Sequence, residues 1–169
     1  PMAAYITPND LVLCPKGIRF CSKIFPCSIG RGGISSRKRE GDGATPSGVH
    51  RITGILYRPD RMARPTSWAV PIRLGDLWSD DPNDLEYNMM VRAPYDASHE
   101  KLQRADPLYN LVILTDWNWP YAVRQRGSAI FIHRWRRPGY PTEGCIGLNP
   151  EHLLWIAKRI KFNTRLIVK

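Results

Sequence analysis

The stretch that decides the fold is Ile130-Phe-Ile-His-Arg-Trp-Arg-Arg-Pro-Gly-Tyr-Pro-Thr-Glu-Gly-Cys-Ile-Gly-Leu148. It begins with an apolar strand of the buried type, which ends at His133. A basic loop stiffened by two prolines follows, and Cys145 then comes directly after a glycine. The next residues, Asn149 and Pro150, are typical of the capped start of a helix. The sequence therefore predicts a strand, a returning loop and a helix that covers a sheet.

The rest of the chain favours short strands. Its 169 residues fit the size of one domain, and its 15 prolines, nearly twice the average usage of about 5%, interrupt long helices. We expect strands over 11–14, 18–21, 22–29, 49–57, 109–115, 128–133 and 164–168, and an ordered loop with strand fragments over 59–107. The expected fold is a single domain over residues 1–169, mainly β with short helices (α+β) and one clear helix after the cysteine.

Charge and length limit the partners. With 25 Lys and Arg against 15 Asp and Glu, the net charge of +10 attracts nucleic acid, acidic lipid or a carboxylate-rich polymer. The basic residues are spread along the chain, which disfavours nucleic-acid binding. No apolar run approaches the roughly 18 residues of a membrane span. We see no secretory signal after Met2, and Pro1 is interpreted as a residue left by cloning, so the location stays open.

The cysteines are not expected to bind metal, because the spacing of the first three matches no zinc pattern and no His lies close by. Cys14 and Cys21 lie in alternating apolar stretches around a Pro-Lys-Gly turn. We expect them to be small core residues that face each other across a hairpin, with a disulfide as the alternative.

Cys145 and His133 together suggest nucleophilic catalysis. The reactive form of cysteine is the thiolate, and an imidazolium or a helix N-terminus lowers the pKa of a thiol. His133 would supply the imidazolium and then protonate a departing amine. Backbone N–H groups around Gly144 and Cys145 would hold the oxyanion. The alternative is that both residues simply belong to the core.

Two segments of the chain resemble one known family. Residues 142–146 read Thr-Glu-Gly-Cys-Ile after the strand that ends in His133, and far upstream the chain reads Lys38-Arg-Glu-Gly-Asp-Gly-Ala-Thr-Pro-Ser-Gly48. This combination resembles the L,D-transpeptidase catalytic domain (YkuD, or ErfK/YbiS), and the likeness extends from about Cys27 to the C-terminal strand. It implies a β-sandwich-like catalytic domain that acts on bacterial peptidoglycan, in the periplasm or cell envelope.

The resemblance also implies roles for individual residues. Cys145 would attack a stem-peptide carbonyl and form a thioester, which a diaminopimelate amine of a second stem would resolve. His133 matches the family's base, Gly144 its glycine before the nucleophile, and Thr142 a residue that helps to orient the imidazole. No metal or organic cofactor is implied, carbapenems would acylate the same thiol, and we expect a monomer that binds donor and acceptor stems.

Three departures from the family pattern affect the substrate site. Glu143 stands where the family usually has His, Gly147 stands where it usually has Arg, and the loop between His133 and Cys145 is short. Without that arginine, the candidate partners for substrate carboxylates are Arg134, Arg136 and Arg137, unless these are only solvated.

Further candidates for the site are Glu143, which would attract the incoming amine, and His99 with Glu100, which would line the groove. For each of them a purely structural or surface role is the alternative. The short loop leaves the cross-link open between 3→3 and 1→3. Hydrolysis of the same thioester would make the protein an L,D-carboxypeptidase. A non-catalytic peptidoglycan-binding module is disfavoured by the intact Cys145 and His133.

Overall fold

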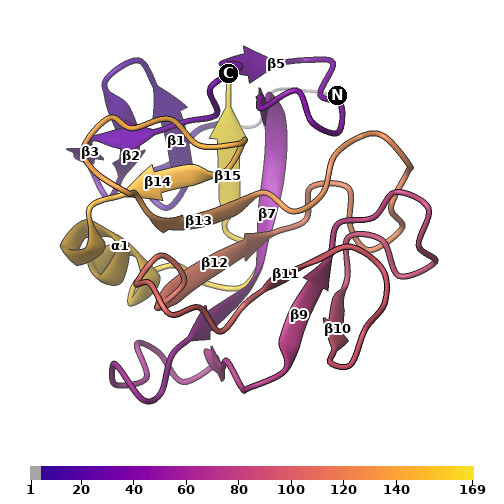
Figure 1. The fold of residues 1–169 in the computed structure, drawn as a ribbon. Coiled ribbons are helices and arrows are strands. Elements are labelled where there is room, and N and C mark those ends of the chain that lie inside the picture. Colours follow the sequence, from indigo (N-terminus) through magenta and orange to yellow (C-terminus); the bar gives the residue numbers. More distant parts are fainter. Residues whose placement is uncertain (1–4) are drawn as a thin grey trace.

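The computed structural model describes residues 5–169 (Figure 1), so the interpretation of Pro1 and Met2 lies outside the described residues. These residues form fifteen strands and one helix: β1 (Leu11–Cys14), β2 (Gly17–Phe20), β3 (Lys23–Phe25), β4 (Cys27–Ser28), β5 (Ile34–Ser35), β6 (Thr45–Pro46), β7 (Gly48–Tyr57), β8 (Val70–Pro71), β9 (Asp76–Ser79), β10 (Met90–Arg92), β11 (His99–Lys101), β12 (Leu111–Thr115), β13 (Phe131–Arg134), β14 (Ile146–Leu148), α1 (Pro150–Ala157) and β15 (Arg165–Val168). The prediction of a mainly β chain with one clear helix is confirmed.

The main sheet has the order β3-β2-β1-β15-β7-β12-β13-β14-β4, and β8 pairs with β7. The long strand β7 pairs antiparallel with both β15 and β12 and so joins the two halves of this sheet (Figure 1). The sheet curls into a near-barrel. Toward the β4 end of this order, β13 and β14 run parallel, with His133 opposite Gly147. This pairing brings the strand that carries His133 beside the strand that follows Cys145.

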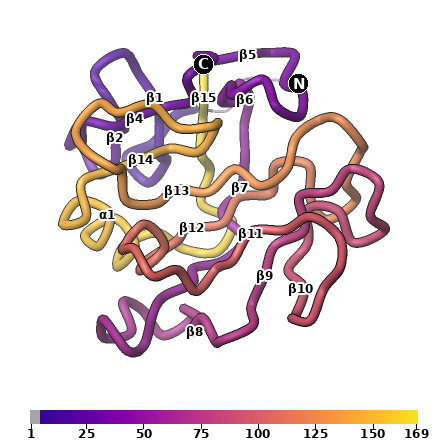
Figure 2. The backbone as a smooth tube through the Cα atoms, in the orientation of Figure 1, coloured from indigo at the N-terminus to yellow at the C-terminus, as the bar shows by residue number. Residues whose placement is uncertain are grey.

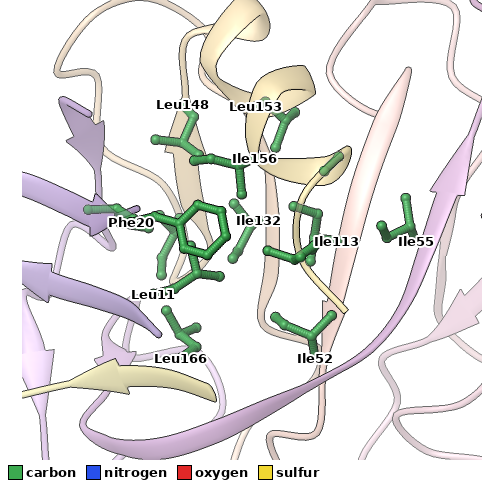
Figure 3. Close-up of a cluster of buried hydrophobic side chains, with 14 of the residues drawn as sticks. Leu11, Phe20, Ile52, Ile55, Ile113, Ile132, Leu148, Leu153, Ile156 and Leu166 are labelled. Atoms are coloured by element: carbon green, nitrogen blue, oxygen red, sulfur yellow. The ribbon is translucent and has the colours of Figure 1, made fainter. Parts of the chain in front are cut away.

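The main core fills the concave side of this sheet under α1 (Figure 3). Leu11, Ile52 and Ile132 are fully buried there, and Leu153 and Ile156 reach them from the helix. Each such side chain contributes about 1.5–3 kcal/mol when it leaves water. The helix begins as predicted, because the Asn149 side chain accepts the N–H of Glu151 and Pro150 occupies the first turn.

A second, smaller cluster positions the site. Because successive side chains of a strand point to opposite faces, Ile132 enters the main core while Phe131 and His133 face the other way. Phe131 packs there edge-on against Trp78, with ring centroids 5.1 Å apart, and Cys145 packs against the same cluster. The apolar pattern of β13 thus places its histidine on the face where the cysteine lies.

The region 59–107 forms a separate three-stranded sheet of order β10-β9-β11. In Figure 2, β9 and β10 lie on the side of the view away from β1 and β2. The prediction of strand fragments with little helix is confirmed for this region. The sheet matters for function because β11 carries Glu100 to the site described below.

The cysteines are all free. The pairing across the first hairpin differs from our expectation, because Cys14 lies opposite Gly17, and Cys21 follows β2 in the left-handed region, at φ 52°. The Cys14 thiol donates to the carbonyl of Gly17 at 3.1 Å. Within residues 5–169 no helix has the length and apolar character needed to cross a membrane.

Candidate active site

A cleft of about 1010 Å³ opens beside β13. Three segments line it. The first segment, residues 128–145, includes His133, Arg136 and Cys145, and we call it the nucleophile wall after the role that the sequence predicts for Cys145. The β11 wall consists of Asp80, which follows β9, and of Glu100, Arg104, Leu108 and Tyr109. The third segment is the loop over residues 31–41, which contributes Arg31, Lys38, Glu40 and Gly41.

Cys145 lies on the turn just before β14 and is partly buried. Its Sγ accepts the backbone N–H of Phe131 at 3.4 Å and lies 3.8 Å from the carbonyl oxygen of Ala129. Burial, followed by the negative charge of Glu100, raises the pKa of the Cys145 thiol to about 12. At neutral pH the resting residue is therefore a thiol.

His133 is buried on β13, and its tautomer follows from its hydrogen bond. Nδ1 lies 2.6 Å from the carbonyl oxygen of Arg134. A carbonyl only accepts, so Nδ1 carries the proton and Nε2 keeps the lone pair. The ring stands edge-on to Tyr109, with centroids 5.3 Å apart. Burial lowers the pKa of His133 to about 4, so the imidazole is neutral at neutral pH.

The expected resting pair of thiolate and imidazolium is therefore wrong for this structure. Burial disfavours the charged form of both groups, and its effect exceeds that of the neighbouring hydrogen bonds. The helix N-terminus does not reverse this, because α1 begins only after β14 and Asn149 caps it. In the described part of the chain His133 and Cys145 line one cleft without a direct hydrogen bond between them.

The turn before the nucleophile depends on Gly144, whose φ is +137°. A Cβ at this position would lie 2.8 Å from the carbonyl oxygen of Ala44. The Thr142 hydroxyl accepts the Gly144 N–H at 3.0 Å and donates to the Cys145 carbonyl at 2.5 Å. The backbone carbonyl of Thr142 accepts the N–H of Arg31 at 2.7 Å. Thr142 therefore shapes the turn and does not orient the imidazole, which corrects the role that we expected for it.

Thr45 is a site-forming residue that sequence reasoning missed. Its hydroxyl is fully buried, accepts the N–H of Gly30 at 2.9 Å and donates to the carbonyl of Gly144 at 2.7 Å. It thereby ties the nucleophile turn to two distant segments. The available signal was its place in the segment 38–48, which carried the resemblance to the family.

A search against family models matches residues 12–168 to the L,D-transpeptidase catalytic domain, YkuD. The chain belongs to this family. Searches of the curated proteins and of the solved structures found no match to this chain. YkuD domains are cysteine-dependent enzymes that modify peptidoglycan, so the family gives the cleft a substrate class and agrees with the resemblance found in the sequence.

The structure explains one departure from the YkuD pattern. Gly147 lies in β14 between Ser28 and His133. A Cβ there would lie 2.9 Å from Cβ of Trp135, which is itself buried. Glycine at this position therefore lets Trp135 pack on the sheet, and the arginine usual in the family would displace it.

The predicted substrate-binding residues separate into two groups. Arg136 and Glu143 line the cleft, whereas Arg134, Arg137 and His99 do not. Glu143 is exposed and pairs with Arg31, Oε2 to Nε, at 2.7 Å. The Arg137 guanidinium lies over the ring of Tyr140, and His99 Nδ1 lies 2.7 Å from the carbonyl oxygen of Ala97.

The cleft also contains charged residues that our predicted site lacked, namely Arg31, Lys38, Glu40, Asp80 and Arg104, and it contains Glu100, which we expected to line the groove with His99. Lys38 is buried, and its Nζ lies 2.7 Å from Oδ1 of Asp42. Its charge acts on Cys145 by lowering the pKa of the thiol, against the larger effect of burial. Glu100, which the sequence analysis named only alongside His99, accepts the Tyr109 hydroxyl at 2.8 Å.

Proposed function

We propose that this YkuD domain is a peptidoglycan L,D-transpeptidase. Cys145 would attack the carbonyl of a donor stem peptide, release the downstream D-amino acid and hold the stem as a thioester. A diaminopimelate side-chain amine of a second stem would then attack, giving a 3→3 or 1→3 cross-link. The observation that carries this proposal is that Cys145 and His133, the residues matching the family's nucleophile and base, line one cleft.

The first half of the reaction, acylation of Cys145, starts from a neutral thiol and a neutral imidazole. Nε2 of His133 takes the proton of the thiol as Sγ attacks the carbonyl carbon. The carbonyl of Arg134 accepts the hydrogen bond of Nδ1 and raises the pKa of His133 against the effect of burial. The developing imidazolium is therefore stabilised when the tetrahedral intermediate forms, and it then protonates the departing amine.

The oxyanion of that intermediate needs backbone donors. The N–H of Gly144 is already bound to the Thr142 hydroxyl. We therefore assign the N–H of Cys145 as the donor to the oxyanion. From the sequence we expected donors from both Gly144 and Cys145. The rigid turn held by Thr142 and Thr45 fixes the direction of the Cys145 N–H.

A cationic side chain in the cleft suits a substrate with carboxylates. Arg136 is the cleft-lining member of the three arginines that we expected to bind stem carboxylates, and it is the residue that we assign to one. The cleft as a whole is mixed in charge, because Glu40, Asp80, Glu100 and Glu143 line it as well as Arg31, Lys38, Arg104 and Arg136. The net charge of +10 raises the local concentration of anionic stems. That Arg134 and Arg137 bind stem carboxylates remains a prediction, and it applies to longer substrates that extend beyond the cleft.

The test is to incubate the purified protein with tetrapeptide muropeptides and to measure the products by mass spectrometry. We expect a dimer, and fragmentation of it would give the linkage position. Loss of the terminal D-residue alone would instead mean an L,D-carboxypeptidase, and unchanged substrate would exclude both activities.

Cys145→Ala is expected to abolish both the dimer and covalent labelling by a carbapenem while the protein stays folded. Cys27→Ala is the matched control, because Cys27 is also a partly buried free cysteine but does not line the cleft. Equal loss in both variants, or none in either, would contradict the role of Cys145.

A further inference from the structure

Among the carboxylates that line the cleft, Glu100 is the one whose charge acts on the Cys145 thiol, and it has no part in the reaction described so far. Glu100 lies on β11 and lines the cleft together with Cys145. Its Oε1 accepts the Tyr109 hydroxyl at 2.8 Å, and within residues 5–169 no donor reaches Oε2. After burial, the charge of Glu100 is the largest cause that raises the pKa of the Cys145 thiol. A carboxylate with one oxygen that accepts no hydrogen bond therefore shares the cleft with the Cys145 sulfur and acts on it electrostatically.

The cations around Glu100 are held by other carboxylates. Arg104 makes a two-pronged contact with Asp106, Nε to Oδ1 at 3.0 Å and Nη2 to Oδ2 at 2.6 Å. Lys38 is bound to Asp42 at 2.7 Å. An inward-facing carboxylate without a cation of its own is costly to keep charged. A cation brought by a substrate would offset that cost.

The acceptor of the proposed reaction supplies such a cation. Its amine is an ammonium at neutral pH and has to lose a proton before it can attack a thioester. Burial lowers the pKa of His133 to about 4, so His133 binds a proton weakly in the resting site. Burial, with the nearby Asp80 and Glu40, raises the pKa of Glu100, so this carboxylate holds a proton more strongly than an exposed one.

We propose that Glu100 binds the ammonium of the acceptor stem and takes one of its protons, a role that rests on the transpeptidase function proposed above. The freed amine then attacks the thioester carbon, a C–N bond forms and the C–S bond breaks. The second proton of the amine passes through His133 to the departing sulfur of Cys145. Glu100 finally releases its proton to solvent, so the net products are the amide and the free thiol.

The experiment compares two acceptors with the same donor tetrapeptide. One acceptor is a diaminopimelate-containing stem, whose amine is charged near neutral pH, and the other is hydroxylamine, which is uncharged there. In Glu100→Gln, which keeps an oxygen for the Tyr109 hydroxyl, we expect acylation of Cys145 to persist. Transfer to the stem amine should fall about 100-fold, the size of a lost general base. Transfer to hydroxylamine should be largely retained, and hydrolysis should rise.

Asp81→Asn is the matched control. The substitution removes one negative charge, as Glu100→Gln does, but at a residue next to Asp80 that does not line the cleft. The asparagine side chain can still accept the N–H of Asn83. We expect wild-type selectivity between the two acceptors. Tyr109→Phe, which leaves the Glu100 carboxylate in place, should also keep the preference for the charged acceptor.

Three results would overturn the role of Glu100: an unchanged ratio of the two acceptors in Glu100→Gln, an equal fall with both acceptors, or loss of Cys145 acylation in Glu100→Gln and Tyr109→Phe alike. A wild-type protein that forms neither an acyl adduct nor a dimer would instead remove the proposed function itself. The two failures are thus distinguishable.

Discussion

The two walls of the cleft are built in different ways. The nucleophile wall comes from consecutive residues of the chain, a strand, a loop and a turn, so His133 and Cys145 reach it through local structure and the β13–β14 pairing. The β11 wall comes from a separate small sheet, which packs against β13 through Trp78 and Phe131, and from the connection between β11 and β12. The comparison teaches that the wall supplying the nucleophile is readable in sequence, whereas the wall controlling its environment depends on tertiary packing.

The largest effect on the nucleophile wall is expected from His133→Gln. Glutamine can still donate to the Arg134 carbonyl but cannot take the thiol proton at Nε2. The rate of Cys145 acylation by a donor stem, measured by quenched-flow mass spectrometry, should fall about 10²- to 10⁴-fold, as for other general bases. A rate near that of the wild type would remove His133 from the mechanism.

The same residue determines the pH profile. Because burial lowers the pKa of His133 to about 4, the base loses its lone pair only as the pH falls toward that value. Burial also raises the pKa of Cys145 to about 12, so no thiolate forms between neutral pH and pH 9. The acylation rate should therefore be flat over that range and decline at acid pH. A steep rise around the ordinary thiol pKa of about 8.5 would indicate a preformed thiolate instead.

Thr45→Val tests the two hydrogen bonds by which Thr45 connects the turn before Cys145 to the rest of the molecule. Valine matches threonine in shape but leaves the Gly30 N–H and the Gly144 carbonyl without their partner. The free energy of unfolding should fall by about 1–3 kcal/mol for each buried group left unpaired. Denaturant melts would give this loss, and activity should fall as well because Gly144 positions the nucleophile. An unchanged melt would contradict the assigned contacts.

The smallest effect is expected at the rim, with Glu143→Gln. This side chain is 80% exposed and its partner Arg31 is 54% exposed, so the pair is screened by water. Exposed pairs contribute about 0–1 kcal/mol, and the stability should change by no more than that. If transfer to the stem amine nevertheless fell more than in Glu100→Gln, the acceptor would enter along the nucleophile wall and the comparison of the two walls would be reversed.

Much of the fold could be predicted because its signals are local. The cap of α1 follows from Asn149 and Pro150, and the buried strand ending in His133 follows from its apolar run. The family was recognisable because Cys145 and the segment 38–48 both keep their pattern. The pairing of Cys14 with Gly17 was missed because a tight turn sets the register and excludes Cys21 from the strand.

The environment of the site could not be predicted in the same way. A sequence gives the residue type of Cys145 but not its burial, and burial is what reverses the expected shift of its pKa. Thr45 and Glu100 reach the site from positions remote in the chain, through a hydrogen bond in one case and a separate sheet in the other. The role expected for Thr142 came from the family resemblance, which does not tell that its hydroxyl meets the backbone of Gly144 and Cys145.

The most direct test of the account is the intact mass of the protein quenched during turnover of a donor tetrapeptide, followed by peptide mapping of the adduct. We predict a stem peptide lacking its terminal D-residue, attached to Cys145, which disappears when an acceptor amine is added as the dimer forms. A product that accumulates with no adduct, or with an adduct on Cys14, Cys21 or Cys27, would contradict it.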